Sequence, residues 1–167
     1  MFDVRKILYL AIAVFAVGCQ PKSAEPLIWP QGLGIIELDG GKIKPCLDCE
    51  NKVVVFHNFN ESQLVPFKQV FMWKEHVEKY PDISFLIYAS GDDIKYVTNK
   101  LTEYEFPISV FHDPEFSFYK ANNLDTVDLQ FKNLIAFLVV GNKVVDYAAI
   151  GMPEHFDKQL RSLNAGK

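Results

Sequence analysis

The 167-residue sequence has few cysteines and no run of basic residues, and each shortage excludes a class of protein. Three cysteines are too few for a domain held together by a disulfide framework. Lysine and arginine total 17 against 21 acidic residues, so the electrostatic footprint of a nucleic-acid-binding protein is missing. The four histidines are scattered and none has metal-ligand spacing to another. We therefore expect no nucleic-acid partner, no metal and no cofactor.

The first eighteen residues are predicted to be a signal peptide that is removed from the mature protein. Arg5 and Lys6 precede an uninterrupted apolar run at residues 7–17. A helix over this run rises about 16 Å, against roughly 30 Å of bilayer hydrocarbon. The run is therefore too short to span a membrane, but it suits the apolar region of a signal peptide.

The signal peptide ends in small residues followed by one cysteine, Ala16-Val17-Gly18-Cys19, which resembles the bacterial lipobox. The resemblance implies that Cys19 is acylated, becomes the first mature residue and holds the protein on a membrane. Gln20, which is not aspartate, implies sorting to the outer membrane, where the protein faces the periplasm. The alternative is an ordinary secretory signal in which this cysteine is incidental.

Residues 19–31 include three prolines and are predicted to be an extended tether, which leaves residues 32–167 as a single α/β domain. In that domain strand patterns alternate with helical ones, an order typical of a sheet with a parallel centre. The expected strands are a hairpin of 34–38 with 42–44, then 52–58, 84–88, 108–111, and a second hairpin of 134–140 with 143–147. Four helices are expected. The first spans 62–79 with a buried stripe of Phe67, Val70, Trp73, Val77 and Tyr80. The second is capped by Asp92 or Ser90 and has a buried stripe of Ile94, Val97, Leu101 and Tyr104. The third is short, at 114–121, and the last opens at Pro153 with Phe156, Leu160 and Leu163 inward.

Several short motifs follow one another in this domain. They are Leu38-Asp39-Gly40, Glu50-Asn51-Lys52 with the strand 53–56, Phe111-His112-Asp113-Pro114, and residues 137–145 with Ile150-Gly151. Their order and spacing resemble the thioredoxin fold. They are most similar to its redoxin branch, which includes the alkyl hydroperoxide reductase/thiol-specific antioxidant proteins and membrane-tethered thiol–disulfide oxidoreductases. The resemblance covers residues 33–164 and implies a three-layer α/β/α domain with a mixed central sheet and an N-terminal β-hairpin.

The positions that carry chemistry in these relatives differ here. The family places a cysteine just past the first core strand, where a helix N-terminus stabilises the thiolate. The matching residues 58–66 contain no cysteine, and residues 132–135, which match the family's cis-proline segment, contain no proline. We therefore expect the usual redox chemistry to be absent and the protein to bind a partner protein or peptide.

Candidates for a binding site lie beside this position, and each has a structural alternative. His57 is a titrating group or a hydrogen-bonded histidine of the core. Asn60 and Ser62 are binding groups or helix caps. Glu61 is an acid or base, or a solvated carboxylate of the first helical turn.

Cys46 and Cys49 form a CxxC motif, for which three interpretations remain open. The pair can be redox-active, in which case a thiol–disulfide oxidoreductase using Cys46 and Cys49 is the alternative function. It can be a structural disulfide, which export to an oxidising compartment favours. It can also be half of a zinc site. Because the motif precedes strand 52–58, whereas sites in parallel sheets form beyond the carboxyl ends of strands, we favour the structural disulfide.

Overall fold

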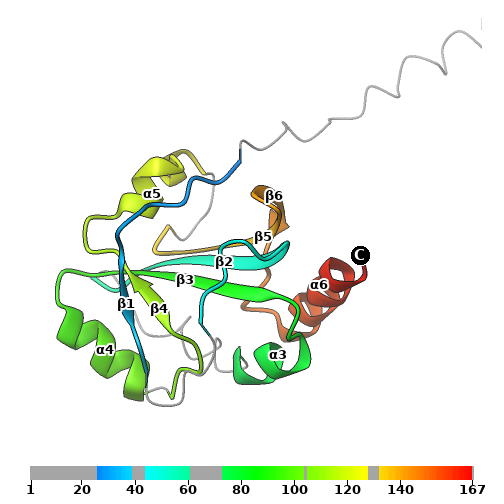
Figure 1. Cartoon of the computed structure of the whole chain (residues 1–167), viewed down its shortest axis with the longest axis horizontal. Helices are drawn as coiled ribbons and strands as arrows, with labels where there is room; N and C mark the ends of the chain where they lie inside the picture. Colours follow the sequence, from blue (N-terminus) through cyan, green and yellow to red (C-terminus); the bar gives the residue numbers. More distant parts are fainter. Residues whose placement is uncertain (1–25, 39–43, 61–72, 104, 128–131, 167) are drawn as a thin grey trace, which may run out of the picture.

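The computed structural model describes residues 26–38, 44–60, 73–103, 105–127 and 132–166. These residues form one mixed sheet of six strands in the order β1-β4-β3-β2-β5-β6, with helices on both faces (Figure 1). The strands are β1 (Gly34–Ile36), β2 (Asn51–Asn58), β3 (Ser84–Ser90), β4 (Val110–His112), β5 (Leu134–Val140) and β6 (Lys143–Tyr147). The helices are α3 (Trp73–Lys79), α4 (Ile94–Glu103), α5 (Ser117–Ala121), the 3-10 helix η2 (Leu124–Thr126) and α6 (Pro153–Ala165).

The centre of the sheet is β2, all eight residues of which are buried. It runs parallel to β3 and antiparallel to β5, and β3 runs parallel to β4. The continuous apolar run in the sequence predicted this central position, because a strand covered on both faces has no polar side. The predicted hairpin of β5 with β6 is also confirmed.

The structure describes only the first strand of the predicted N-terminal hairpin, as β1. Within the described residues β1 pairs antiparallel with β4, with Ile36 opposite Val110. Lys44 lies in no strand, and residues 39–43 lie outside the described residues. Pairing with β1 satisfies backbone groups that β4 would otherwise present at a sheet edge, and it buries Ile36.

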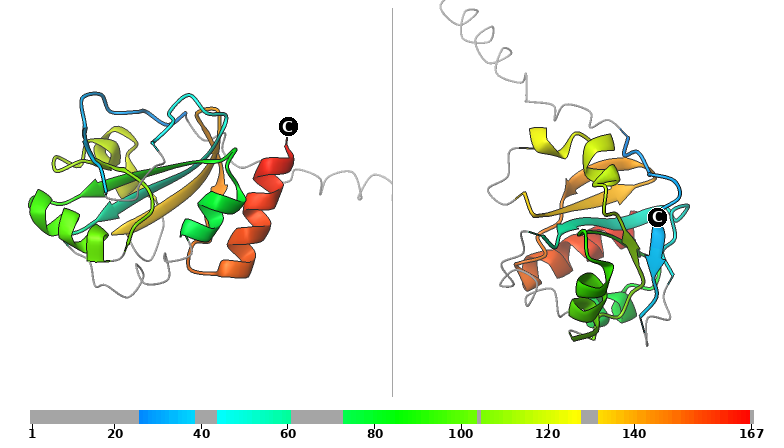
Figure 2. Two further views of the ribbon diagram at one scale, coloured as in Figure 1. Left: turned by 60° about the horizontal axis from the view of Figure 1, so that its bottom comes forward. Right: turned by 90° about the vertical axis from the view of Figure 1, so that its left-hand side faces the viewer.

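Helices lie on both faces of the sheet, in agreement with the predicted three-layer α/β/α architecture (Figure 2), and an apolar layer covers each face. Alternate residues of β2 point to opposite faces, so Val53 and Val55 join one layer, while Val54 and Phe56 join the other. The first layer lies beneath α3, α4 and α6. The second lies beneath α5 and the segment from Leu27 to Leu33.

The described part of the helix predicted over 62–79 is α3. Its residues Trp73 and Val77 are buried as expected, and so is Tyr80, which follows the last residue of the helix. Residues 61–72, which include the predicted core positions Phe67 and Val70, lie outside the described residues. In α6 the predicted inward residues are all buried; they are Phe156, Leu160 and Leu163. None of the helices in the described ranges has the length and apolar content that a membrane span requires.

The cap of α4 is Asp93, so the predicted caps Asp92 and Ser90 are wrong. Asp93 Oδ1 accepts hydrogen bonds from the backbone N–H groups of Lys95 and Tyr96, at 2.8 and 3.2 Å. A capping side chain must precede the first helical residue directly to reach these donors, whereas Ser90 still belongs to β3. Of the predicted stripe, Val97 and Leu101 are buried, Ile94 is exposed, and Tyr104 lies outside the described residues.

Candidate functional site

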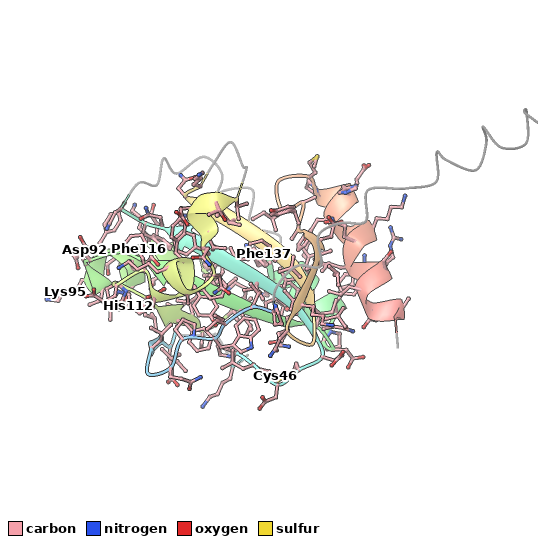
Figure 3. The ribbon with its side chains drawn as sticks, turned by 90° about the horizontal axis from the view of Figure 1, so that it is seen from above. Cys46, Asp92, Lys95, His112, Phe116 and Phe137 are labelled. Atoms are coloured by element: carbon pink, nitrogen blue, oxygen red, sulfur yellow. A yellow bond between two sulfur atoms is a disulfide. The ribbon has the colours of Figure 1, made fainter. Side chains whose placement is uncertain are left out.

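The carboxyl ends of β2, β3 and β4 meet at one edge of the sheet, which we call the carboxyl edge. Asn58 lies opposite Ser90, and Ala89 lies opposite His112. Ligand sites of parallel sheets form beyond this edge, and the resemblance places the family thiolate here. Asp92, His112 and Phe116 lie at this end of the molecule, away from Cys46 (Figure 3).

Two asparagine amides tie the chain segments at the carboxyl edge. Asn58 Oδ1 accepts the N–H of Asn60 at 3.0 Å. Asn60 Oδ1 accepts the N–H of Asp92 at 3.2 Å and so joins the segment after β2 to the segment after β3. A Cβ on Gly91 would stand 3.0 Å from Val97 Cγ2 and 3.2 Å from the Cβ of Phe59, so a side chain there would crowd both neighbours. This edge is packed with backbone and amide groups.

His57 lies just inside the carboxyl edge and points into the core. Its side chain is 3% exposed and stacks on Phe59, with 4.3 Å between the ring centroids. Burial lowers the pKa of His57 to about 3, because the charged imidazolium loses its hydration. At neutral pH the ring is uncharged. Asn60 is exposed beyond it, whereas the candidates Glu61 and Ser62 lie outside the described residues.

The motif His112-Asp113 organises the segment after β4. Asp113 is fully buried, and its two carboxylate oxygens accept the backbone N–H groups of Ser117 and Phe118 at 2.7 and 2.8 Å. His112 Nε2 lies 3.0 Å from the carbonyl oxygen of Gly91, so this nitrogen carries a proton and donates. Both side chains are engaged in holding the loops after β3 and β4.

Cys46 and Cys49 are joined in a disulfide, with a Cα–Cα distance of 5.5 Å, in the turn that precedes β2. Cys46 donates its backbone N–H to Ser84 Oγ at the start of β3, at 3.1 Å. The sulfur pair therefore lies at the amino ends of the parallel strands. An eight-residue strand is about 23 Å long between its end Cα atoms, so β2 separates the pair from the carboxyl edge by this length.

No protein-family model and no curated protein matches the sequence. Solved structures do match. A secreted Mycobacterium tuberculosis disulfide oxidoreductase homologous to E. coli DsbE is 11% identical, with a TM-score of 0.51 over 70% of this chain and 84% of that one. The MTB protein dsbF is 14% identical, with a TM-score of 0.52 over 70% and 83%. A thioredoxin-like protein in its oxidized form is 12% identical, with a TM-score of 0.55 over 86% and 95%. The chain has a thioredoxin-like fold.

Although the fold is thioredoxin-like, the sequence departs from the family pattern at the carboxyl edge, where the resemblance places the reactive cysteine. The carboxyl edge presents the amides of Asn58 and Asn60 and the carboxylate of Asp113, while the sulfur atoms of Cys46 and Cys49 lie at the other end of β2. The described residues contain no group of three or more histidine, cysteine, aspartate or glutamate side chains that could hold a metal ion. The arrangement at the carboxyl edge can hold loops together and present a polar surface.

The sequence pattern does not reveal the burial of Lys52, which is the second residue of β2 and is 1% exposed. Its ammonium group donates to the carbonyl oxygen of Gly141 and lies 5.8 Å from the ring centroid of Trp29. Burial lowers the pKa of Lys52, and the nearby carboxylates of Glu50 and Asp48 oppose that shift. Lys52 thus fixes the turn between β5 and β6. The available signal was a lysine at the start of a continuous apolar run.

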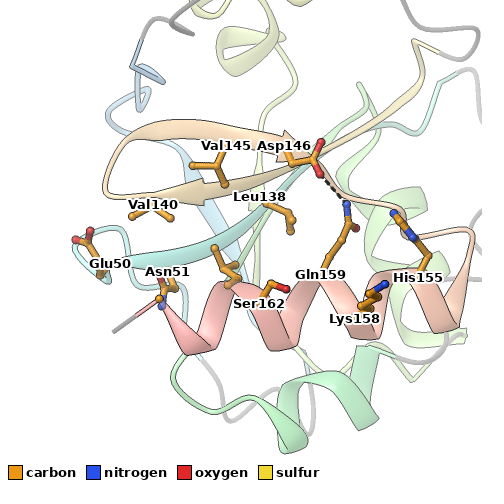
Figure 4. Close-up of a pocket in the computed structure, with 12 residues that line it drawn as sticks. Glu50, Asn51, Leu138, Val140, Val145, Asp146, His155, Lys158, Gln159 and Ser162 are labelled. Atoms are coloured by element: carbon orange, nitrogen blue, oxygen red, sulfur yellow. Dashed lines mark hydrogen bonds between the residues drawn. The ribbon is translucent and has the colours of Figure 1, made fainter. Parts of the chain in front are cut away.

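The sequence also gives no sign of a groove beneath the β5–β6 hairpin. Its volume is about 550 Å³, and α6 forms the opposite wall (Figure 4). The buried side chains of Leu138 and Leu163 line it, together with the exposed Lys158 and the partly exposed Gln159. No local pattern could predict it, because the groove depends on the spacing between a hairpin and a helix.

Proposed function

We propose that this protein is a lipid-anchored, thioredoxin-like protein of the bacterial cell envelope that binds a partner protein or peptide as an accessory protein. The signal-peptide pattern of residues 1–18 and the lipobox-like position of Cys19 support an acylated anchor. Gln20 supports sorting to the outer membrane, facing the periplasm. One structural neighbour is described as secreted, which is consistent with an exported protein.

One observation carries the non-catalytic part of this proposal: the sulfur atoms lie at the amino end of β2 and not at the carboxyl edge. A nucleophilic thiolate is stabilised by a helix N-terminus or by a nearby cation. Cys49 is followed by a strand instead of a helix, and the carboxylates of Asp48 and Glu50 flank it. Their negative charges disfavour a thiolate at this position.

A thiol–disulfide oxidoreductase that uses Cys46 and Cys49 is the second candidate, favoured by the partial exposure of both residues. A partner thiolate would attack one sulfur of the pair, form a mixed disulfide and release the other sulfur as a thiolate. A second partner thiol would then attack the mixed disulfide. The partner would lose two electrons and become a disulfide, while the pair would gain two electrons and become two thiols.

Insulin reduction by dithiothreitol separates the two candidates. We expect the wild-type chain, the variant Cys46→Ser and the control Cys19→Ala to give the same rate as dithiothreitol alone. The control removes the predicted acylation site and keeps the disulfide pair. A faster rate in wild type and Cys19→Ala that is lost in Cys46→Ser would overturn the accessory function and establish the second candidate.

Phase partitioning tests the anchor separately. We expect wild-type protein from cell envelopes to enter the detergent phase, and Cys19→Ala to move to the aqueous phase, because acyl chains supply the membrane affinity. If Cys19→Ala stayed in the detergent phase, acylation at this residue would be contradicted.

A further inference from the structure

The groove between the β5–β6 hairpin and α6 has the size and lining of a small-molecule site. Its volume of about 550 Å³ lies within the roughly 300–1,000 Å³ that is usual for such sites. Leu138 and Leu163 are nearly buried in it, whereas Val140 and Val145 are more exposed. The lining is mostly apolar, and polar side chains stand around it (Figure 4).

A β-bulge in β6 shapes the wall of the groove. Leu138 pairs with Asp146 and Val139 with Val144, so Val145 is an extra residue on β6. A bulge redirects side chains from the regular alternation of a strand. As a result both Val145 and Asp146 line the groove, and Val145 is 56% exposed at its mouth. An apolar side chain therefore faces solvent where a ligand would enter.

The polar groups of the groove are of two kinds. Asp146 and Gln159 are mutually satisfied: Gln159 Nε2 donates to Asp146 Oδ2 at 3.1 Å, and Asp146 Oδ1 accepts the N–H of Tyr147 at 2.8 Å. Lys158 and His155, in contrast, take part in none of the ion pairs among the described residues. They lie toward one end of the groove, with Glu50 at the other (Figure 4).

We propose that this groove binds a fatty-acid carboxylate. The head lies at Lys158 and His155, whose nitrogen atoms supply donors for a carboxylate. The acyl chain lies along the apolar lining, which offers dispersion contacts and little hydrogen bonding. Glu50 at the far end disfavours the reverse orientation by charge repulsion. The proposal does not depend on the absence of thiol chemistry, so the insulin assay and the binding assay can fail independently.

Titration with decanoate tests the proposal on the full chain carrying Cys19→Ala, in which no acyl group can be attached at that residue. We expect saturable binding by calorimetry, with shifts of the backbone amide signals of Val145, Lys158 and Leu163. Affinity should rise about fourfold for each methylene added from octanoate to decanoate, because each methylene is removed from water.

Three variants test the orientation of decanoate in the groove. Lys158→Glu should weaken decanoate about tenfold, as expected for reversal of one partly exposed charge, and leave 1-decanol unchanged. Val145→Asp should weaken both probes. Lys95→Glu is the matched control, because Lys95 is an exposed lysine of α4, and it should change neither affinity. Thermal unfolding of each variant checks that it remains folded, and Lys158→Glu removes no buried contact.

Three results would overturn the proposal. The first is the absence of saturable decanoate binding, or signal shifts confined to residues away from the groove. The second is tighter binding of decyltrimethylammonium than of decanoate. The third is a wild-type affinity for decanoate in Lys158→Glu.

Discussion

Different interactions stabilise the two ends of the central sheet. At the carboxyl edge, side-chain oxygens of Asn58, Asn60 and Asp113 join the loops by accepting hydrogen bonds from backbone N–H groups. At the amino end, a covalent bond closes the turn before β2 and a buried lysine fixes the neighbouring hairpin. Hydrogen bonds to a buried charged group stabilise the folded state directly, whereas a disulfide across four residues restricts the unfolded chain only slightly.

This difference shows how a thioredoxin-like fold can hold its carboxyl edge together although residues 58–66 contain no cysteine. A catalytic edge must leave a reactive group exposed and incompletely satisfied. Here the carboxylate of Asp113 is fully buried and both of its oxygens accept hydrogen bonds. The comparison therefore predicts that the carboxyl edge contributes more to stability than the sulfur pair does.

The largest expected effect comes from Asp113→Ala. The substitution leaves the N–H groups of Ser117 and Phe118 without their acceptors, and we expect a loss of about 3 kcal/mol in the free energy of unfolding. Urea denaturation followed by circular dichroism measures it. Asp113→Asn, which keeps one carbonyl acceptor, is the control and should lose about half as much. A loss below about 1 kcal/mol for Asp113→Ala would show that this carboxylate does not hold the edge.

The second effect is a pH dependence caused by His57. Its pKa is about 3 in the folded protein against 6.5 for the ordinary side chain, so between these values the unfolded chain binds a proton that the folded chain does not. Stability therefore falls as the pH falls through this window, by about 2–3 kcal/mol between pH 7 and pH 4.5.

Urea denaturation at several pH values, in wild type and His57→Gln, measures this dependence as a difference in slope. His76, whose pKa burial also lowers, contributes in the same direction in both proteins and cancels in the comparison. Equal slopes in the two proteins would mean that His57 is protonated in the folded state at acidic pH.

The smallest effect is expected at the amino end. Opening the Cys46–Cys49 disulfide with Cys46→Ser should lower the free energy of unfolding by only about 1–2 kcal/mol, because the closed loop is short. Cys19→Ala is the matched control and should leave stability unchanged. If Cys46→Ser cost as much as Asp113→Ala, the two ends would contribute equally and the comparison would no longer hold.

Much of the fold could be predicted from local patterns. The run from Val53 to Phe56 identified a strand covered on both faces, and the spacing of Phe156, Leu160 and Leu163 identified the buried side of α6. The partner of β1 could not be predicted, because a three-residue strand pairs with whichever edge is left open by the rest of the sheet. The predicted caps of α4, Asp92 and Ser90, precede the observed cap Asp93 by one and three residues, since nearby polar residues differ only in their distance from the first helical donors.

The candidate site also combines features that follow from local sequence with features that depend on tertiary structure. Residue order by itself places a cysteine pair before β2 and no cysteine after it. It did not reveal the buried ammonium of Lys52 or the groove that includes Lys158. Both depend on elements that are distant in the chain: Lys52 reaches a turn 89 residues away.

By itself the sequence determined the alternation of strands and helices, the fold that this order resembles, and the distance of the sulfur pair from the end of β2, because each is set by local periodicity and residue order. Only the tertiary structure decided which strand β1 joins, which groups Asp113 and Lys52 satisfy, and where a bulge in β6 opens a groove against α6. These features depend on side chains and backbone groups that meet through packing, and their positions are fixed only when the whole sheet has formed.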